Sequence, residues 1–247
     1  MRYFIEISYN GTAYHGWQKQ PNATSVQEVV EDGLKRLLGE AISVLGAGRT
    51  DTGVHAKQMI AHFDSDSSFV ETDVVYKLNA FLPEDIAVHS LYKVRPDAHA
   101  RFDALSRTYL YRISLTKNPF SFQNAYFIKY PLNIAKMQQA SQVLLGYKDF
   151  QCFSKSNTDV KTYYCNILKC DWILVKDELH LVIKADRFLR NMVRAIVGTI
   201  INIGTGKLDN DDLYAIIASK NRSKAGYSVP AHGLYLTEIE YPENIKL

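Results

Sequence analysis

The sequence predicts an α+β fold made of two split-βαβ domains, of the ferredoxin or RNP type, with mostly antiparallel sheets joined around a central cleft. Strands with alternating apolar and polar residues are mixed with amphipathic helices, without the strict strand–helix rhythm of a doubly wound sheet. The order strand–helix–strand–strand–helix–strand fills the first half and recurs loosely in the second. A chain of 247 residues, 47% hydrophobic and 22% charged, has room for two such domains. We expect them to cover residues 1–104 and 105–247.

The elements of the first half follow directly from local patterns. "RYFIEISY" alternates and predicts a strand over 2–9. "SVQEVVEDGLKRLLG" has apolar residues at helical spacing, with Ser25 as N-cap and Glu28 completing a capping box. Strands "ISVLGAG" and "QMIAHFDSD" flank a glycine-rich loop, and a short helix over 73–81 and a strand over 86–94 complete the series.

The second half begins near 95–106 and repeats the same kinds of element. We expect a strand over 107–115, a helix over 133–146 and a hairpin over 167–186 that turns at Lys176 and Asp177. A long helix over 187–203, a shorter one over 211–220 and a strand over 234–241 follow.

Composition excludes several classes of protein. The three cysteines form no C-x-x-C pair, so neither a zinc site nor a disulfide framework is indicated. The longest apolar stretches, such as 195–203, fall short of the roughly 18 residues of a membrane span. Because the N-terminal residues also lack the apolar run of a signal peptide, we expect a cytoplasmic protein without membrane contact. The net charge of +3 is too small to identify a polyanionic partner by itself.

The stretch "GAGRTDTGVHA" (46–56) places a carboxylate, an arginine and a histidine among glycines. Its spacing matches neither the Walker loop nor the dinucleotide fingerprint, and "GTGK" at 204–207 lacks both the first glycine and the final Ser/Thr of a Walker loop. An aspartic protease needs two carboxylates that share a proton, whereas this stretch has only Asp51. An aspartate is ionised at neutral pH and can act as a nucleophile without a partner base. The alternative from chemistry alone is a turn aspartate that stabilises its own loop.

The stretch "GRTDTGVHA" closely resembles the signature G-R-T-D-x-G-V-H-A of the TruA-type tRNA pseudouridine synthases. The similarity covers essentially the whole chain, because further segments occur in the family's order and at about its spacing. These segments are "YNGTAYHGWQKQP", "SVQE", "LNAFLPEDIAV", "HARFDA", "RTYLYRI", "FLRNMVRAIVG" and "GLYL".

This resemblance implies an isomerase that converts uridine to pseudouridine in the anticodon stem-loop of tRNA, at positions 38, 39 and 40. It also implies a homodimer in which one tRNA touches both subunits, and no metal or organic cofactor. The family's nucleophilic aspartate falls on Asp51 and its base-stacking tyrosine on Tyr109. The arginine that pairs with the carboxylate falls on Arg194, although Arg190 lies one helical turn away, and the signature arginine falls on Arg49.

The remaining candidates are substrate-binding residues. Spacing on the expected helix places Arg187, Arg190 and Arg194 on one face, where they would hold RNA; a solvated face is the alternative for the first two. His55 is a candidate for substrate binding or for a structural hydrogen bond. Lys155, Lys161 and "SKNRSK" at 219–224 are candidates for phosphate contacts, and Trp17 and Gln18 for loop packing or RNA contact.

Overall fold

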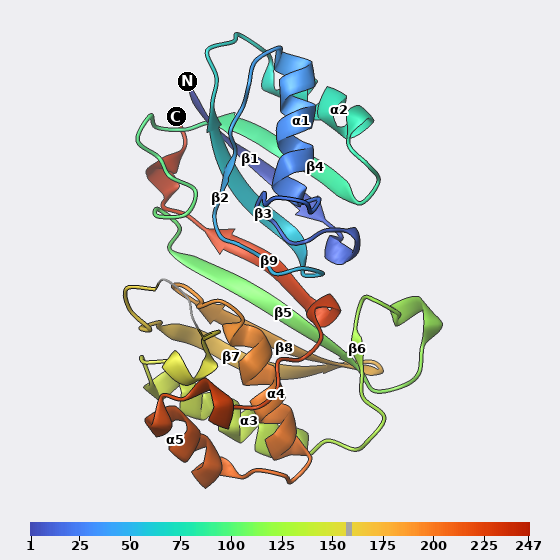
Figure 1. Cartoon of the computed structure of the whole chain (residues 1–247), viewed down its shortest axis with the longest axis vertical. Coiled ribbons are helices and arrows are strands. Elements are labelled where there is room, and N and C mark those ends of the chain that lie inside the picture. The colour runs from blue at the N-terminus through green and yellow to red at the C-terminus, as the bar shows by residue number, and fades with distance from the viewer. Residues whose placement is uncertain (157–159) are drawn as a thin grey trace. The chain divides into compact units, whose positions relative to one another are not determined.

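A computed structural model of the chain describes residues 1–156 and 160–247, with helices packed on mostly antiparallel strands (Figure 1). The α+β class that the sequence predicts is confirmed. Residues group into two compact units, of which the first is Met1–Leu105 with Tyr235–Leu247 and the second is Ser106–Leu234. The predicted second domain, 105–247, differs from the second unit because the last strand pairs with a strand of the first.

The first unit is built on an antiparallel sheet. Strand β1 (Arg2–Tyr9) lies between β3 (His55–Asp64) and β4 (Ile86–Lys93), and both pairings are antiparallel. Strand β9 (Leu234–Glu240) adds a parallel pairing to β3, in which His55 lies opposite Tyr235. The N-terminal end of β3 is therefore fixed from the side of β9 as well as β1.

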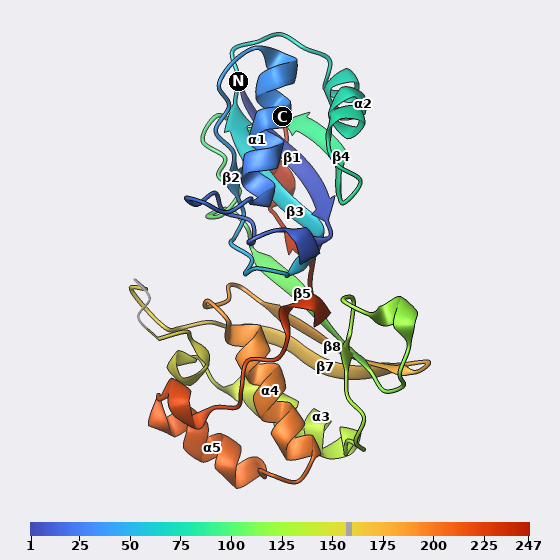
Figure 2. The ribbon, with the colours of Figure 1, turned by 45° about the vertical axis from the view of Figure 1, so that its right-hand side comes forward.

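Two helices cover one face of this sheet, α1 (Val26–Leu38) and α2 (Glu71–Phe81) (Figure 2). The predicted cap of α1 is confirmed, since the Ser25 side chain accepts a hydrogen bond from the Glu28 amide and Gly39 ends the helix with φ of 73°. Both faces of β1 are buried, since the consecutive residues Phe4 and Ile5 point to opposite faces and are both 0% exposed, as is Ile7.

The strand expected over 42–48 is wrong in extent, because β2 contains only Leu45–Gly46. The backbone of Val44, just before β2, hydrogen-bonds to side chains of α1 instead of to a neighbouring strand. The Val44 amide donates to the Glu31 carboxylate at 3.0 Å, and the Val44 carbonyl accepts from the Gln27 amide at 2.9 Å. These side-chain bonds satisfy the backbone that a sheet would otherwise pair.

The second unit has its own antiparallel sheet, in the order β5, β8, β7. The strands are β5 (Ser106–Ser114), β6 (Tyr126–Phe127), β7 (Ile167–Val175) and β8 (Glu178–Ala185). The helices are α3 (Ile134–Val143), α4 (Met192–Gly204) and α5 (Asn210–Ser219). The predicted hairpin is confirmed, with Lys176 in the left-handed region at its turn.

Helix α4 begins five residues later than the sequence predicts. Asn191 adopts φ of 66°, a left-handed conformation that α-helices exclude, and Met192 is the first helical residue. Upstream, the Asp186 carboxylate accepts hydrogen bonds from the amides of Asn166 and Arg187 and fixes a turn. The prediction that Arg187, Arg190 and Arg194 share one helix face is therefore wrong, because the first two precede the helix.

Helix α4 is otherwise buried, as its apolar composition predicts; Ile196, Val197 and Ile200 are at most 1% exposed. Across residues 1–156 and 160–247, no helix combines the length and the apolar character that crossing a membrane requires.

Candidate active site

The Asp51 loop connects β2 to β3 in the first unit. Asp51 is partly exposed and Arg49 is exposed, while Thr50 between them is buried. The Thr50 hydroxyl lies 2.9 Å from the Tyr9 hydroxyl, and the Thr50 carbonyl accepts a hydrogen bond from the Trp17 amide at 3.3 Å. A turn closes after Asp51, since its carbonyl accepts from the Val54 amide at 3.1 Å. Arg49 and Asp51, on either side of Thr50 in the sequence, therefore belong to a backbone segment that hydrogen bonds hold in place.

The segment 11–17 packs directly against this loop, backbone against backbone. A Cβ atom on Gly16 would collide with the Thr50 carbonyl, and one on Gly11 would collide with the Val54 carbonyl. The Gly53 amide donates to the Tyr14 carbonyl at 3.3 Å. Glycine is required at positions 11 and 16 because no side chain fits between this segment and the backbone of the Asp51 loop. Sequence reasoning considered the glycines of the loop itself and missed these two, for which the spacing in "YNGTAYHGW" was the available signal.

Trp17 is buried and packs on the glycine that precedes the loop. Its side chain is 2% exposed, and a Cβ atom on Gly46 would collide with the indole. Of the two roles left open for Trp17, loop packing is therefore the one that the burial supports, while Gln18 beside it is exposed.

His55 is buried at the start of β3. Its Nδ1 accepts a hydrogen bond from the Gly11 amide at 3.0 Å, so Nδ1 carries no proton in this geometry. The ring stacks on Tyr235, with centroids 4.5 Å apart and planes inclined by 21°. These contacts join segment 11–17, β3 and β9 at the base of the loop. Substrate binding by His55 stays a prediction.

In the second unit, Tyr109 lies on β5 and is partly exposed. Its ring packs at a right angle against the ring of Phe188, with centroids 5.1 Å apart and planes at 89°. Edge-to-face packing of this kind fixes the plane of an aromatic ring. A flat ring held on a strand in this way can support a base by stacking.

Arg194 lies in the first turn of α4 and is partly buried. Its Nε donates to the Val229 carbonyl at 2.7 Å, and the Val229 amide donates to the Arg194 carbonyl at 3.3 Å. Next to it the Tyr111 hydroxyl donates to the Pro230 carbonyl at 2.9 Å. Burial raises the pKa of Tyr111 above its ordinary value, an effect that the positive charge of Arg194 partly offsets. The 227–230 segment therefore orients the guanidinium of Arg194.

The other basic candidates lie in the chain before α4 and at the end of α5 or just after it. Arg187 is partly exposed and Arg190 is exposed, and the Arg190 carbonyl accepts a hydrogen bond from the Lys155 amide at 3.0 Å. Arg222 fixes the segment 226–228, since its side chain donates to the Gly226 carbonyl at 2.9 Å and to the Ser228 hydroxyl at 2.8 Å. Burial lowers its pKa from the ordinary value of an arginine.

The predicted residues thus form two groups. Arg49, Asp51 and His55 belong to one stretch of the first unit, whereas Tyr109, Arg187, Arg190 and Arg194 belong to the second. The ion pair between Asp51 and Arg194 joins residues of different units and stays a prediction. Within the part of the chain that the structure describes, no group of three or more His, Cys, Asp or Glu residues is arranged to hold a metal ion.

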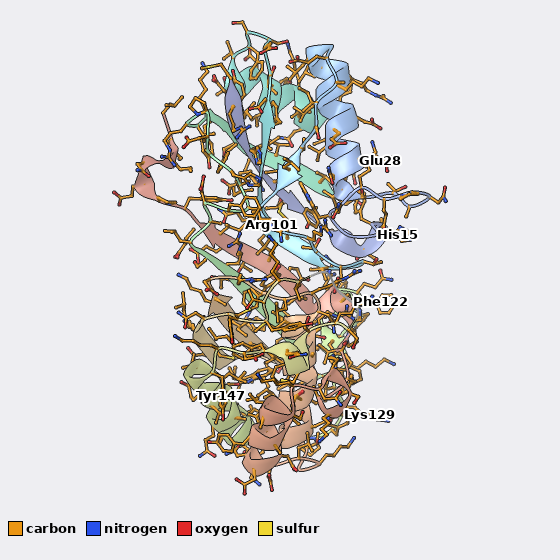
Figure 3. All side chains as sticks on the ribbon, turned by 60° about the vertical axis from the view of Figure 1, so that its left-hand side comes forward. His15, Glu28, Arg101, Phe122, Lys129 and Tyr147 are labelled. Atoms are coloured by element: carbon orange, nitrogen blue, oxygen red, sulfur yellow. The ribbon has the colours of Figure 1, made fainter. Side chains whose placement is uncertain are left out.

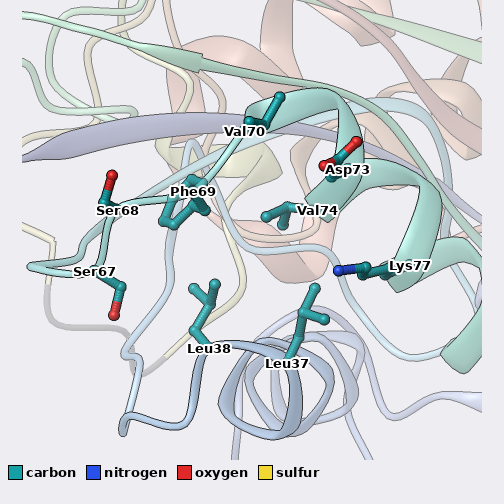
Figure 4. Close-up of a pocket in the computed structure, with 9 residues that line it drawn as sticks. All are labelled: Leu37, Leu38, Ser67, Ser68, Phe69, Val70, Asp73, Val74 and Lys77. Carbon is teal, nitrogen blue, oxygen red and sulfur yellow. The ribbon is translucent and has the colours of Figure 1, made fainter.

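A cavity of about 520 Å³ lies in the first unit, between the C-terminal end of α1 and the start of α2 (Figure 4). Its lining includes Leu37, Phe69, Val74 and Lys77. None of the predicted catalytic residues lines it, so it is separate from the candidate site.

Comparison with known proteins decides the family. The sequence pattern of a family described as tRNA pseudouridine synthase matches residues 6–103 and 140–242. The chain belongs to the tRNA pseudouridine synthase family. The residues matched include both Asp51 and Arg194, while Tyr109 lies between the two matched ranges.

Full-length relatives support the same assignment. The chain is 51% identical over 247 residues to tRNA pseudouridine synthase A of Bacteroides fragilis, with 99% of this chain and 98% of the relative covered. It is 48% identical to the protein of that name from Bacteroides thetaiotaomicron, with 99% and 92% covered. The Bacillus licheniformis protein of that name is 40% identical, with 98% and 99% covered. This member of the pseudouridine synthase family is therefore an isomerase that acts on uridine in RNA.

Proposed function

We propose that this chain converts uridine to pseudouridine at positions 38, 39 and 40 of the tRNA anticodon stem-loop, with Asp51 as the essential nucleophile. The observation that carries the proposal is the way in which the surrounding backbone positions the Asp51 side chain. A tightly packed, glycine-dependent backbone presents one partly exposed carboxylate in the segment that resembles the signature of the family.

The reaction needs three things from the protein. The bond between C1′ and N1 must break, the detached base must be retained and turned, and C5 must join C1′ as its proton leaves. Asp51 can attack C1′, add to C6, or remove the 2′ proton to give a glycal. In each route the carboxylate must be ionised and close to the nucleotide. No external oxidant or reductant is consumed, because product and substrate are isomers.

Residues of the second unit would complete the site. We assign to Tyr109 the stacking surface for the loose base and to Arg194 the cation that pairs with Asp51. A guanidinium and an ionised carboxylate form strong charge-assisted hydrogen bonds, and Asp51 is the carboxylate proposed to pair with Arg194. Arg49 would contribute positive charge beside Asp51, and Arg187 and Arg190 would contact phosphates.

The assembly that we propose follows the same family resemblance. It consists of a cytoplasmic homodimer whose two subunits both contact one tRNA. Within each chain, a split-βαβ first unit would carry the catalytic aspartate, and the second unit would carry the stacking tyrosine and the arginines.

The experiment that tests the proposal is tritium release from tRNA labelled at C5 of uridine. Wild-type protein should release tritium to water, and Asp51→Asn should release none while it binds tRNA with an affinity close to that of wild type. Asp32→Asn, on the exposed face of α1, is the matched control and should be fully active. Full activity of Asp51→Asn would instead support a non-catalytic RNA-binding role for this loop. Mapping of pseudouridine in the product tests the three positions.

A further inference from the structure

The loop between β5 and α3 exposes aromatic side chains to solvent. Phe120 is 91% exposed and Phe122 is 74% exposed, and further along the loop Phe127 and Tyr130 are 43% and 39% exposed. The loop extends beyond the end of β5 (Figure 1), and Figure 3 shows Phe122 and Lys129 projecting outward from the second unit. Several large apolar rings gathered on one surface loop indicate a binding surface.

The loop backbone is held in place by its own hydrogen bonds. The Asn118 side chain accepts from the Phe120 amide at 2.9 Å, and the Ala125 amide donates to the Ser121 carbonyl at 3.0 Å. Strand β6 then pairs with β5, and the buried Ile128 fixes the far end. The exposed rings therefore stand on an ordered frame, which lowers the entropy lost when they bind a partner.

The charged residues in the sequence of this loop and its flanks have one sign, and Glu178 of β8 is an acidic group that reaches the loop from elsewhere, since its carboxylate accepts from the Ser121 hydroxyl at 3.4 Å. From residue 104 to residue 148 the sequence contains neither aspartate nor glutamate. The charged residues of this stretch are all basic: Arg107, Arg112, Lys117, Lys129, Lys136 and Lys148. Arg112 is neutralised by Glu178, whose carboxylate accepts from it at 2.7 Å, whereas Lys117 and Lys129 are exposed on the loop itself. This charge is complementary to a polyanion.

The loop is also connected to the segment that orients Arg194. The hydroxyls of Tyr126 and Tyr227 are 3.3 Å apart, and Tyr227 opens the 227–230 segment whose Val229 carbonyl accepts from Arg194. The pair of tyrosine hydroxyls thus links the loop to the segment that orients Arg194.

We propose that residues 117–130, called here the aromatic loop, are a second RNA contact, in which Phe120 and Phe122 stack on unpaired bases and Lys117 and Lys129 face phosphates. The proposal rests on the proposed function, because tRNA supplies the unpaired bases. Stacking on aromatic rings accepts any base, and lysine contacts add affinity that depends on salt. A second copy of the chain is a poorer occupant for this basic loop, because the chain itself has a net charge of +3, whereas tRNA is a polyanion.

The test compares paired replacements in the full-length protein. Phe120→Ala/Phe122→Ala should raise the Kd for unmodified tRNA, and the KM, by about tenfold or more, with kcat unchanged at saturating tRNA. Phe→Leu at both positions should behave like Ala, because leucine is apolar but cannot stack, and Phe→Trp should restore binding. The matched control is Tyr76→Ala/Phe81→Ala on α2, whose rings are 78% and 59% exposed, and it should leave Kd unchanged.

Charge is tested separately. Lys117→Gln/Lys129→Gln should weaken binding at low salt and make log Kd less steep against log salt concentration. Because the replaced side chains are exposed, circular dichroism should show folding equal to wild type.

Two results would overturn the inference. One is an unchanged Kd in the Ala pair. The other is binding restored by Leu together with a changed oligomeric state in sedimentation, which would assign the loop to a protein partner. Failure of the proposed function has a different signature, namely wild-type protein that binds tRNA but releases no tritium from C5.

Discussion

The hydroxyls of Tyr9 and Thr50 lie 2.9 Å apart in the interior of the first unit, one residue away from Asp51. Tyr9 is 4% exposed and Thr50 is 8% exposed, so water cannot replace this bond readily. It joins the end of β1 to the loop that carries the proposed nucleophile. The loop is therefore positioned by the sheet and not only by its own turn.

Tyr9→Phe should leave the buried Thr50 hydroxyl without this partner and lower the free energy of unfolding by about 1–3 kcal/mol. We expect kcat to fall by roughly tenfold to a hundredfold as the Asp51 loop loosens, with the Kd for tRNA unchanged. Denaturant titration and single-turnover kinetics measure the two effects. In Tyr9→Phe/Thr50→Val both polar groups are gone, and its stability should exceed that of Tyr9→Phe; a further loss would contradict this account.

Gly16→Ala tests the close approach of two backbones. Gly16 has φ of 89°, and a Cβ atom there would collide with the Thr50 carbonyl. The variant should lose about 3 kcal/mol or more of stability and most of its turnover. Gly39→Ala is the control, since Gly39 has φ of 73° but nothing within 4 Å of an added Cβ, and it should lose only about 1–2 kcal/mol. Equal losses in the two variants would show that the collision is unimportant.

Phe188 should act as a positioning residue for Tyr109. Replacing it by leucine removes the edge-to-face contact, which is worth about 0.5–1.5 kcal/mol beyond simple burial. We expect Phe188→Leu to lower kcat by roughly twofold to tenfold, with little change in KM, and Phe188→Tyr to retain wild-type turnover. Steady-state kinetics on unmodified tRNA distinguish these outcomes. A loss of tRNA affinity without a change in kcat would instead place Phe188 in binding.

The first unit should lose stability in mild acid because of His62. Burial, helped by the charges of His99 and Arg2, lowers the pKa of His62 from 6.5 to about 4, although Asp64 opposes the shift. Its Nδ1 accepts a hydrogen bond from the Ala100 amide at 3.2 Å, which requires the neutral ring. Below pH 6.5 the unfolded chain therefore binds a proton that the folded chain does not, and stability falls as pH decreases towards 4.

Between pH 6.5 and pH 5 this one group should remove about 1.5 kcal/mol of stability. Denaturant unfolding across that range should show a shallower pH dependence in His62→Gln than in wild type. An NMR titration should find the His62 ring neutral down to about pH 4. A normal titration near pH 6.5, or equal slopes in both proteins, would refute the assignment.

Local patterns were sufficient for most of the elements. Ser25 and Gly39 bound α1 because caps depend on a few neighbouring residues, and the hairpin turn at Lys176 is encoded in the same way. The signature around Asp51 identified the candidate nucleophile from the sequence. The errors occurred where side chains distant in the sequence decided the backbone, as with Glu31 at Val44 and Asp186 before α4.

By itself, then, the sequence determined the α+β class, the kinds and order of the elements, and the family to which Asp51, Tyr109 and Arg194 are matched. Only the tertiary structure decided that β9 pairs with β3, that Gly11 and Gly16 touch the Asp51 loop, and that Arg187 and Arg190 precede α4. Periodicity and capping act over a few residues and leave a pattern in the chain. Strand pairing and the close approach of distant backbone segments depend on which surfaces meet after folding, and no local pattern records that.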